Sequence, residues 1–471
     1  MSRRHFPIRA SYLLIVMSVA GCTTTSADYK QPQFDLPDHW PTQSVTSQTT
    51  SVHVGERWWG MYGDPVLDRL EDEALAHNTD IQIAAARLLE LRAQLGVTEA
   101  AQSVSVSVNA SANRTKNSLV GTFPRPAAQH IQNSGRVTLD ASYEIDLWGR
   151  LKLASTAARA QMLSAESARD AVRLTLTTNV AQQYFALVSL DAQKTSLRRV
   201  LDGRMERRSL DQKRLDAGVI SSFEIHQSDA DVAAAQSQLT SIAYTREKQE
   251  SQLALLLGRS PRDVLEGVVE RGAPNLAEVT LPEGLPSDLL LRRPDLNEAE
   301  QNLIAQQAEI GVARAAFFPS ISLTAYLGSE STSLASLFSG PAGIFQFAAS
   351  VSQSIFNGGA AKHGLEAVEA RRDQALLNYK QTVTSAFADV RDALSAQTAA
   401  RDTLVSESLR RDELERVWQL VKLRYEGGVA SRLEYLDAER NYIQADLSRL
   451  DAERAQRAAV ADLVKAMGGG W

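Results

Sequence analysis

Residues 214–224 read Arg-Leu-Asp-Ala-Gly-Val-Ile-Ser-Ser-Phe-Glu, and residues 424–434 read Arg-Tyr-Glu-Gly-Gly-Val-Ala-Ser-Arg-Leu-Glu. The two stretches lie 424 − 214 = 210 residues apart and are identical at five of eleven positions. Each has a glycine typical of a helix C-terminus, followed by Ser-x-x-Glu, the capping box that begins a helix. We therefore expect each stretch to be the turn of a helical hairpin, and the chain to contain two copies of one unit.

Further matches extend the duplication toward the N-terminus. Residues 147–149 correspond to 356–358, and positions between 80 and 107 correspond to positions between 295 and 322. Each copy is expected to contain a helix, two strands and two long helices. We expect a leader at 1–21, an N-terminal anchor and equatorial segment at 22–78, a first repeat at 79–288 and a second repeat at 289–471.

The distribution of proline predicts where the long helices lie. No proline occurs in 127–260 or in 342–471, and proline costs about 3 kcal/mol inside a helix. Both runs are rich in Ala, Leu, Gln, Glu and Arg, which favour helices. The expected long helices are about 150–214, 221–257, 360–425 and 431–466.

Four segments alternate apolar and polar residues, which predicts strands with one apolar face. They lie at about 103–114, 134–147, 318–329 and 345–356. Strands of about ten residues with this alternation suit a transmembrane barrel, although a half-buried sheet of a soluble protein has the same local pattern. Four strands cannot close a barrel, and an open edge is not tolerated in lipid. If these strands span a membrane, several chains must share one barrel.

The N-terminus has the features of a secretory signal. Three arginines before residue 10 precede a short apolar run at 12–19, and small residues precede Cys22. This arrangement resembles a bacterial lipoprotein signal that is cleaved before a lipidated Cys22. Thr23 differs from the aspartate that retains lipoproteins at the inner membrane, so the resemblance implies the outer membrane. The alternative is an ordinary signal peptide with an incidental cysteine.

Composition excludes several classes of protein. A single cysteine among 471 residues cannot form a disulfide within the chain or a cysteine zinc site. A net charge of −6 argues against a nucleic-acid partner, and no apolar run reaches the roughly 18 residues of a spanning helix. The seven histidines are dispersed, and no hydrolase, phosphate-binding or dinucleotide motif is present. We therefore expect no enzyme, catalytic residue, metal or cofactor.

Several motifs resemble those of the TolC-like outer membrane efflux proteins. In chain order they are Trp58-Trp59-Gly-Met-Tyr-Gly-Asp64-Pro65-Val-Leu67 with Asn78-Thr-Asp80, Tyr143-Glu-Ile-Asp-Leu-Trp-Gly-Arg150, Arg292-Arg-Pro-Asp-Leu296, Phe317-Phe-Pro-Ser-Ile321 and Phe356-Asn-Gly-Gly359. The resemblance covers nearly the whole chain after the leader. It is strongest to the lipoprotein (NodT-type) outer membrane factors of resistance–nodulation–division (RND) pumps.

The resemblance implies an α+β membrane channel. In a homotrimer, four strands per chain would form a twelve-strand outer membrane β-barrel, continuous with a long periplasmic α-helical barrel. The implied function is a passive exit duct for drugs or other small molecules, energised by an inner-membrane RND-type transporter through a periplasmic adaptor protein. The chain would be lipid-anchored and would also span the outer membrane. The alternative is a non-transporting helical-hairpin lipoprotein that scaffolds the envelope, although a scaffold has no use for four lipid-length strands.

The resemblance also assigns roles at the hairpin ends. The two turns would be the periplasmic entrance and the adaptor-docking site, formed by Gly218, Val219, Ser221, Gly428, Val429 and Ser431. Glu434 and Asp437 would line the closed aperture, and Arg424 and Tyr425 would tie the closed state by hydrogen bonds. On the residues alone, Glu434 is equally a helix cap, Asp437 a solvated carboxylate, and the Arg-Tyr pair a surface feature.

Acidic residues also lie on the polar side of the strand expected at 134–147. Asp140, Glu144 and Asp146 alternate with apolar residues, so they would face the lumen of a barrel. Such residues would make the channel tolerant of cations. The alternative is that they only keep a wetted wall soluble.

Overall fold

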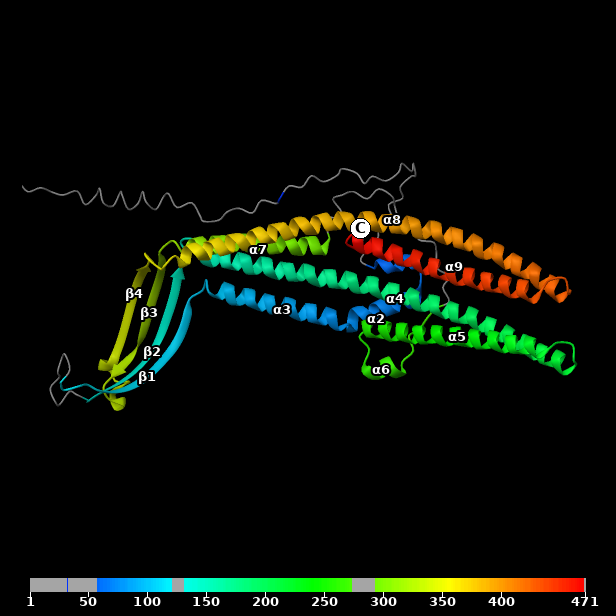
Figure 1. Ribbon diagram of the computed structural model, residues 1–471. Coiled ribbons are helices and arrows are strands. Elements are labelled where there is room, and N and C mark those ends of the chain that lie inside the picture. Colours follow the sequence, from blue (N-terminus) through cyan, green and yellow to red (C-terminus); the bar gives the residue numbers. More distant parts are fainter. Residues whose placement is uncertain (1–31, 33–56, 121–130, 273–292, 470–471) are drawn as a thin grey trace, which may run out of the picture. The chain divides into compact units, whose positions relative to one another are not determined.

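A computed structural model describes residues 32, 57–120, 131–272 and 293–469. Cys22, the signal at 1–21 and much of the 22–78 segment lie outside the described residues. The elements are, in order, η1 (Trp58–Tyr62), α2 (Pro65–His77), α3 (Thr79–Ala100), β1 (Ser105–Lys116), β2 (Ile131–Ile145), α4 (Arg150–Asp216), α5 (Ser222–Leu256), α6 (Pro261–Glu266), α7 (Pro294–Ala315), β3 (Ser320–Ser331), η4 (Leu334–Ser336), η5 (Gly340–Ala342), β4 (Gly343–Ser352), α8 (Ala360–Glu426) and α9 (Arg432–Ala466) (Figure 1).

The expected duplication is confirmed by the order and the lengths of the helices. The first copy runs α3-β1-β2-α4-α5, and the second runs α7-β3-β4-α8-α9. Helices α3 and α7 each have 22 residues, α4 and α8 each have 67, and α5 and α9 each have 35. Figure 1 shows α4 with α5, and α8 with α9, as two antiparallel hairpins.

Contacts divide the chain into two compact units, and each unit draws on both repeats. One unit contains 88–165 and 299–379 and therefore the whole sheet. The other contains 34–87, 166–298 and 380–471 and therefore both hairpin turns. Among the described residues, no helix has both the length and the hydropathy that a membrane crossing requires.

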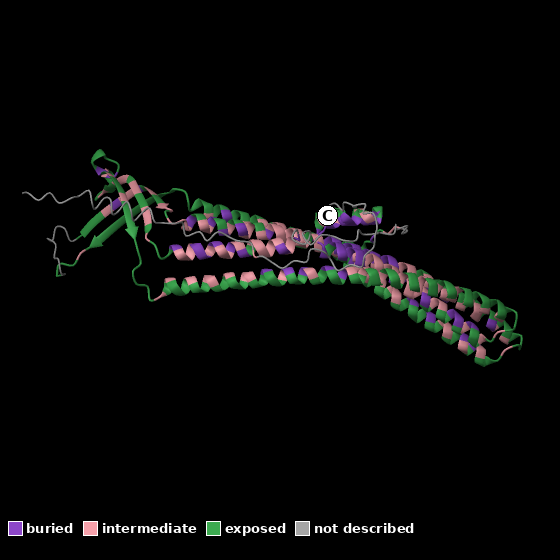
Figure 2. Ribbon diagram, turned by 90° about the horizontal axis from the view of Figure 1, so that it is seen from above, coloured by how far each residue is buried: buried purple, intermediate pink, exposed green. Residues whose placement is uncertain are grey.

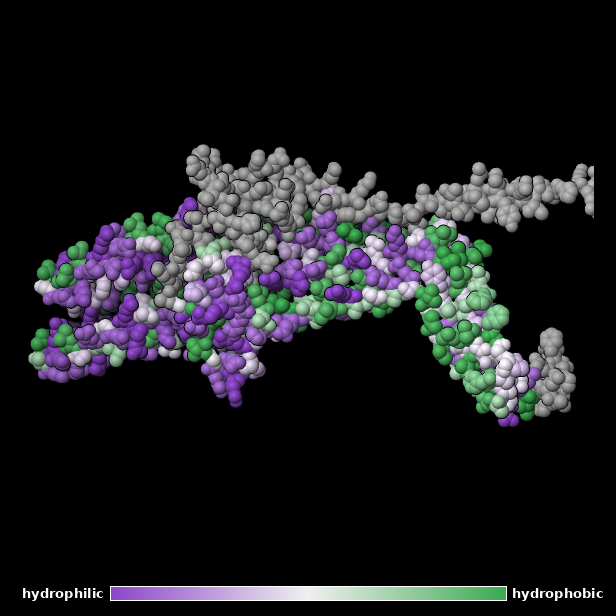
Figure 3. All heavy atoms as spheres, turned by 180° about the vertical axis from the view of Figure 1, so that it is seen from behind, coloured by the Kyte–Doolittle hydropathy of each residue, from purple (hydrophilic) through white to green (hydrophobic). Residues whose placement is uncertain are grey.

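The sheet is antiparallel, with its strands in the order β1-β2-β3-β4. Because paired residues point to the same face, the register gathers the apolar side chains of all four strands on one side. One such row is Val108, Leu139, Leu327 and Phe345, and the adjacent row is Ser107, Asp140, Tyr326 and Gln346. Figure 3 shows hydrophobic side chains along the sheet, at the right of the view.

The apolar face of the sheet is exposed in the single chain. Val108 is 69% exposed, Phe345 76% and Phe347 81%. Figure 2 shows the strands as largely exposed. A soluble protein seldom leaves so continuous an apolar face uncovered, so this face is built to meet another apolar phase.

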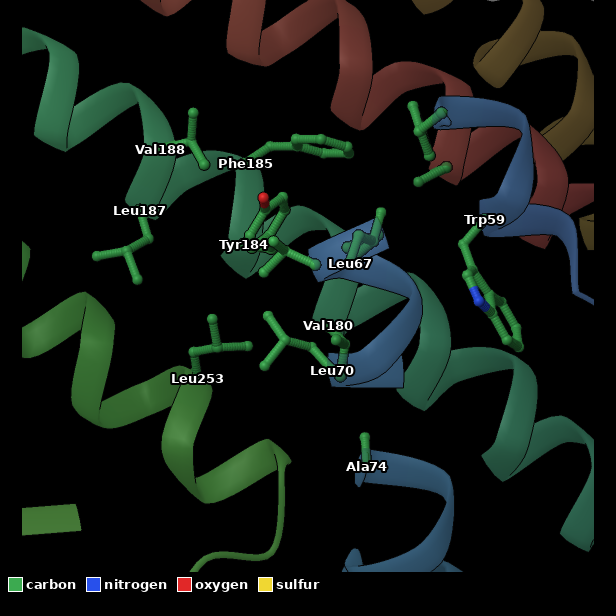
Figure 4. Packing of buried hydrophobic residues seen from close by; sticks show 14 of the residues in the cluster. Trp59, Leu67, Leu70, Ala74, Val180, Tyr184, Phe185, Leu187, Val188 and Leu253 are labelled. Carbon is green, nitrogen blue, oxygen red and sulfur yellow. The ribbon is translucent and has the colours of Figure 1, made fainter. Parts of the chain in front are cut away.

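The main hydrophobic core lies in the second unit, where η1 and α2 pack against α4, α5 and α9 (Figure 4). Trp58, Trp59 and Tyr62 are at most 2% exposed. The Trp58 indole donates a hydrogen bond to Thr177 Oγ1 at 3.1 Å, and the Tyr62 hydroxyl donates to the Arg457 carbonyl at 2.8 Å. The Trp-Trp stretch of the sequence is therefore a packing motif.

The Gly-Asp-Pro motif positions α2. Asp64 accepts hydrogen bonds from the amides of Val66, at 2.8 Å, and Leu67, at 3.3 Å, while Pro65 occupies the first turn. This is the arrangement of an N-cap, which satisfies otherwise unpaired amides. Asp64 also accepts a 2.5 Å hydrogen bond from the Tyr184 hydroxyl of α4.

The Arg-Arg-Pro-Asp motif joins the first and last helices of the second repeat. Arg293 donates to the Ala466 carbonyl at 2.7 Å, and its guanidinium pairs with Asp295 at 2.7 Å and with Asp389 at 3.1 Å. Gly468 has φ +88°, and a Cβ there would lie 2.9 Å from Arg293 Cα. Only glycine fits this close approach without strain.

Glu71 is a fully buried carboxyl in the core, and neither of its side-chain oxygens has a hydrogen-bond partner among the described residues. Burial raises the pKa of Glu71 well above its ordinary value of 4.5, and the nearby carboxylates Asp72 and Asp68 raise it further. The carboxyl is therefore held protonated across a pH range in which an exposed glutamate is ionised.

Replacing Glu71 with methionine is expected to stabilise the protein at neutral pH. Because the folded pKa is raised, the folded state binds more protons than the unfolded state above pH 4.5, so wild-type stability falls as pH rises through this range. Glu71→Met removes this dependence and an unsatisfied buried group worth on the order of 1–3 kcal/mol. Thermal unfolding of detergent-solubilised protein between pH 4 and pH 8 measures the effect.

The exposed Glu90 of α3 provides the matched control. Glu90→Met should leave the wild-type pH profile in place. Parallel profiles for wild type and Glu71→Met would contradict the assignment of a protonated, destabilising carboxyl.

Candidate functional site

The two hairpin turns have the same backbone geometry. Gly218 has φ 71° and Gly428 has φ 73°, which is the left-handed region. The Val219 amide donates to the Arg214 carbonyl at 2.8 Å, and the Val429 amide donates to the Arg424 carbonyl at 2.8 Å. Each glycine therefore ends the long helix in the closing pattern that requires a left-handed residue.

Both returning helices begin with a capping box. The Ser221 amide donates to Glu224 Oε2 at 3.0 Å, and the Ser431 amide donates to Glu434 Oε2 at 2.6 Å. Hydrogen bonds from Ser221 lower the pKa of Glu224, and those from Ser431, with the charge of Arg424, lower the pKa of Glu434. Glu434 is thus a capping residue and an exposed, ionised carboxylate at once.

Equivalent apolar residues are exposed beside the two turns. Val219 and Val429 are each 72% exposed, Phe223 is 72% exposed and its counterpart Leu433 is 75% exposed. Each hairpin thus ends in a glycine-terminated turn with two uncovered apolar side chains.

Glu434 and Asp437 lie one turn apart on α9, and both are exposed. Asp437 accepts hydrogen bonds from Arg440 and, at 3.3 Å, from Asn441. Its counterpart in the first repeat is Gln227, so the acidic pair belongs to the second hairpin alone.

Arg424 and Tyr425 lie at the end of α8. The Tyr425 ring lies 5.3 Å from the Tyr435 ring and 5.9 Å from the guanidinium of Arg207. Among the residues that the structure describes, neither the Arg424 nor the Tyr425 side chain makes a hydrogen bond. The expected tie through hydrogen bonds is therefore absent within this part of a single chain, where Tyr425 makes ring contacts instead.

The three acidic residues near the sheet lie in different surroundings. Asp140 accepts hydrogen bonds from Asn109, at 2.9 Å, and from Thr138, at 2.8 Å. Glu144 pairs with Arg150 at 2.7 Å.

Asp146 differs from the expectation that it lies on the strand. Strand β2 ends at Ile145, and the Asp146 carboxylate accepts a 2.8 Å hydrogen bond from the Lys152 amide at the start of α4. The capping of a helix end therefore takes precedence over the alternation of the strand at this position.

A buried ionic contact between the two hairpins was not foreseen from the sequence. Arg432 of α9 donates to Asp211 of α4 at 3.1 Å and to Ser228 of α5 at 2.7 Å, and it approaches Asp231 at 3.4 Å. Asp211 and Ser228 are each 3% exposed, and the Ser228 hydroxyl donates to Asp211 at 2.5 Å. We call Arg432, Asp211 and Ser228 the hairpin clasp.

The clasp is absent at the equivalent positions of the duplication. At the 210-residue offset, Arg432 corresponds to Ser222 and Asp211 corresponds to Val421. The second copy thus has a cation where the first copy has a neutral serine, and the first copy has an anion where the second copy has a neutral valine. This complementary difference between the repeats was a signal that the sequence carried.

The sequence matches a known protein family over most of its length. The model of the outer membrane efflux protein family matches residues 70–259 and 285–469. The chain is 33% identical over 469 residues to the probable outer membrane lipoprotein SilC of Salmonella typhimurium, with 99% of each chain covered.

Solved channel structures have the same fold. The CmeC outer membrane channel of Campylobacter jejuni has a TM-score of 0.91 at 26% identity, with 95% of each chain covered. The open state of the MtrE outer membrane channel of Neisseria gonorrhoeae has a TM-score of 0.83 at 32% identity, with 95% of this chain and 98% of that chain covered.

Replacing Arg432 with serine, its counterpart in the first repeat, is expected to loosen the contact between the hairpins. The variant leaves the buried Asp211 carboxylate with only the more distant Arg214, at 4.0 Å, and breaking a buried ion pair costs roughly 3–5 kcal/mol. Hydrogen exchange of the amides in 205–216 and 224–235 should increase by at least tenfold.

The double variant Arg432→Ser with Asp211→Val reproduces the neutral residues of both counterparts, Ser222 and Val421. It should recover most of the protection, because no buried charge is left unpaired. Equal exchange in wild type and Arg432→Ser would show that the clasp contributes nothing to hairpin packing.

Proposed function

This chain belongs to the outer membrane efflux protein family, and we propose that it acts as a homotrimeric exit duct of a tripartite efflux system. One observation carries the proposal. The same chain contains a sheet with one exposed apolar face, whose two edges pair with no described residue, and two helical hairpins with matched, exposed ends. The apolar face of the sheet would contact lipid, and the edges of the sheet would pair with neighbouring copies. The exposed ends of the hairpins would contact a periplasmic partner.

The edges support the trimer. Strands β1 and β4 each pair on one side only among the described residues. Unpaired backbone groups are not tolerated in lipid, so the sheet must continue into other copies. Three copies of four strands would give a twelve-strand outer membrane barrel, and the long helices of the three copies would form a periplasmic α-helical barrel.

The hairpin ends support docking of a periplasmic adaptor protein, which connects the channel to an inner-membrane RND-type transporter. Val219, Phe223, Val429 and Leu433 offer apolar contacts beside the turns. Gly218, Ser221, Gly428 and Ser431 hold those turns in shape. The transported class is drugs or other small molecules, and the duct itself is passive.

We assign the periplasmic aperture to Glu434 and Asp437, with Arg424 and Tyr425 beside it. A threefold axis near these residues would bring six carboxylates together. Glu434 is suited to this because its capping hydrogen bonds keep its pKa low, so the charge persists at neutral pH. Asp140 and Glu144, on the polar face of the sheet, would face the lumen, whereas Asp146 would cap α4 at its rim.

We also propose lipidation at Cys22 after removal of the leader at 1–21. The similarity to a protein described as a probable outer membrane lipoprotein supports this, together with the small residues before the cysteine. A triacyl group of this kind would anchor the chain firmly, whereas one acyl chain would not.

Planar bilayer recording on purified protein tests the channel and its aperture together. Wild type should sediment as a trimer and should show a low conductance that increases several-fold after Glu434→Lys or Asp437→Lys. Glu224→Lys is the matched control for Glu434→Lys, because both glutamates form the same capping box and only Glu434 is assigned to the aperture.

Equal changes for Glu224→Lys and Glu434→Lys would contradict the aperture assignment. If no variant conducts and the protein stays monomeric in the bilayer, the duct is excluded and an envelope scaffold explains the hairpins.

The variant Cys22→Ser should lose acylation and leave trimer assembly intact, because the sheet and the helices provide the assembly contacts. Mass spectrometry of the N-terminal peptide and native gel electrophoresis measure the two outcomes. Loss of trimers in Cys22→Ser would show that the anchor also has an assembly role.

A further inference from the structure

A cavity of about 1180 Å³ lies within the second unit, between one face of α4 and the facing parts of α8 and α9. Its volume slightly exceeds the range of about 300–1000 Å³ that is common for small-molecule sites. Gly203 lies in the middle of the α4 wall, and a Cβ there would meet nothing within 4 Å. This glycine keeps the wall open, although glycine disfavours a helix interior by about 1 kcal/mol.

Aromatic rings cover the opposite wall. Trp418 of α8 and Tyr442 of α9 stack with their ring centroids 5.2 Å apart and their planes at 6°. Tyr425 and Tyr435 form a second pair, 5.3 Å apart. Tyr435 is 2% exposed, so the half-buried rings of Trp418, Tyr425 and Tyr442 are the ones that offer apolar surface to a planar ligand.

Cations lie among the rings. The Arg207 guanidinium lies 3.8 Å from the centroid of the Tyr435 ring, and Lys422 Nζ lies 5.7 Å from that of Trp418. Arg207 Nη1 and Trp418 Nε1 are buried donors that lie beside the Tyr435 hydroxyl, and neither makes a hydrogen bond of normal geometry with the described residues. Buried donors are normally satisfied, so both can serve an acceptor placed in the cavity.

The charge that remains unpaired in the cavity is positive. Arg199, Arg207 and Lys213 line it and make no ion pair with the residues that the structure describes. Three of the lining carboxylates are already paired: Asp211 with Arg432 at 3.1 Å, Glu426 with Lys422 at 4.0 Å, and Glu439 with Arg204 at 3.5 Å.

Glu206 is the one lining carboxylate without an ion pair in the described part of the chain. Three unpaired cations against one unpaired carboxylate leave an excess of 3 − 1 = 2 positive charges. The cavity therefore favours an anion.

We propose that this cavity binds a planar aromatic anion, a ring system that carries a carboxylate or a sulfonate. The ring system lies against the aromatic wall, and the anionic group accepts hydrogen bonds from Arg207 and attracts Arg199 and Lys213. The proposal does not depend on the proposed function, because binding is measurable in a protein that conducts nothing.

Isothermal titration calorimetry of the full-length protein in non-ionic detergent, with naphthalene-2-sulfonate as the probe, tests the site. We expect one site per chain, with an affinity that weakens as salt is added. Arg207→Gln should weaken binding by at least tenfold. Gly203→Leu should abolish binding by filling the cavity, while improving helix propensity.

Arg208→Gln is the matched control. Arg208 is the next residue of α4, pairs with Asp229 at 2.8 Å and does not line the cavity. It should keep the wild-type affinity within twofold. The neutral analogue naphthalene-2-sulfonamide should bind at least tenfold more weakly than the sulfonate.

Unchanged binding in both Arg207→Gln and Gly203→Leu would overturn the proposal, because the probe would then occupy another place or the detergent. Equal affinity for the sulfonamide would overturn the selectivity for an anion. If Gly203→Leu loses its trimer or its thermal transition, Arg207→Gln at a half-buried position and Lys213→Gln at an exposed one decide between the outcomes, since neither substitution adds volume to the cavity.

Discussion

A strand in lipid cannot leave its backbone amide and carbonyl groups without partners. A sheet of four strands satisfies the inner edges and leaves two outer ones, at β1 and β4. The sheet can therefore satisfy all of its backbone groups only by pairing with other copies of the chain, and the proposed trimer follows from that requirement. The equivalent helices of the two copies have equal lengths of 22, 67 and 35 residues, as expected of a duplicated unit.

The duplication is exact in the lengths of the three helices of each copy, but the chemistry of the two copies differs. The hairpin clasp gives the second hairpin a cation, Arg432, that reaches Asp211 in the first, and the copies have neutral residues at the exchanged positions. The core also differs between the copies. The elements η1 and α2 precede the first copy, and the described residues contain no equivalent elements before the second copy. These differences distinguish two hairpins that would otherwise be interchangeable.

Local patterns in the sequence predicted the helices, the strand faces and the turns. Alternation, the absence of proline and the Gly-Val, Ser-x-x-Glu order each depend on neighbours in the chain, so they are readable without a structure. Glu71 is different, because it sits in a run of charged residues and looks exposed. Its spacing of four from Leu67 and three from Ala74 placed it on the apolar stripe of α2.

The hairpin clasp and the cavity depend on which helices pack against each other. Contacts between helices that are distant in the chain cannot be predicted from local patterns in one sequence. Arg207 approaches Tyr435 across 228 positions (435 − 207), and no local pattern pairs them. The capping role of Asp146 was missed for another reason: a strand pattern and a helix start overlap at that residue.

The bond from the Tyr62 hydroxyl to the Arg457 carbonyl joins residues 395 positions apart, and Arg293 likewise reaches Ala466. During synthesis the core around η1 and α2 must wait for α9, which is among the last helices to be made. The aromatic core therefore stays uncovered until α9 has been made. Exposed hydrophobic surface of this kind makes a partly folded chain prone to aggregation.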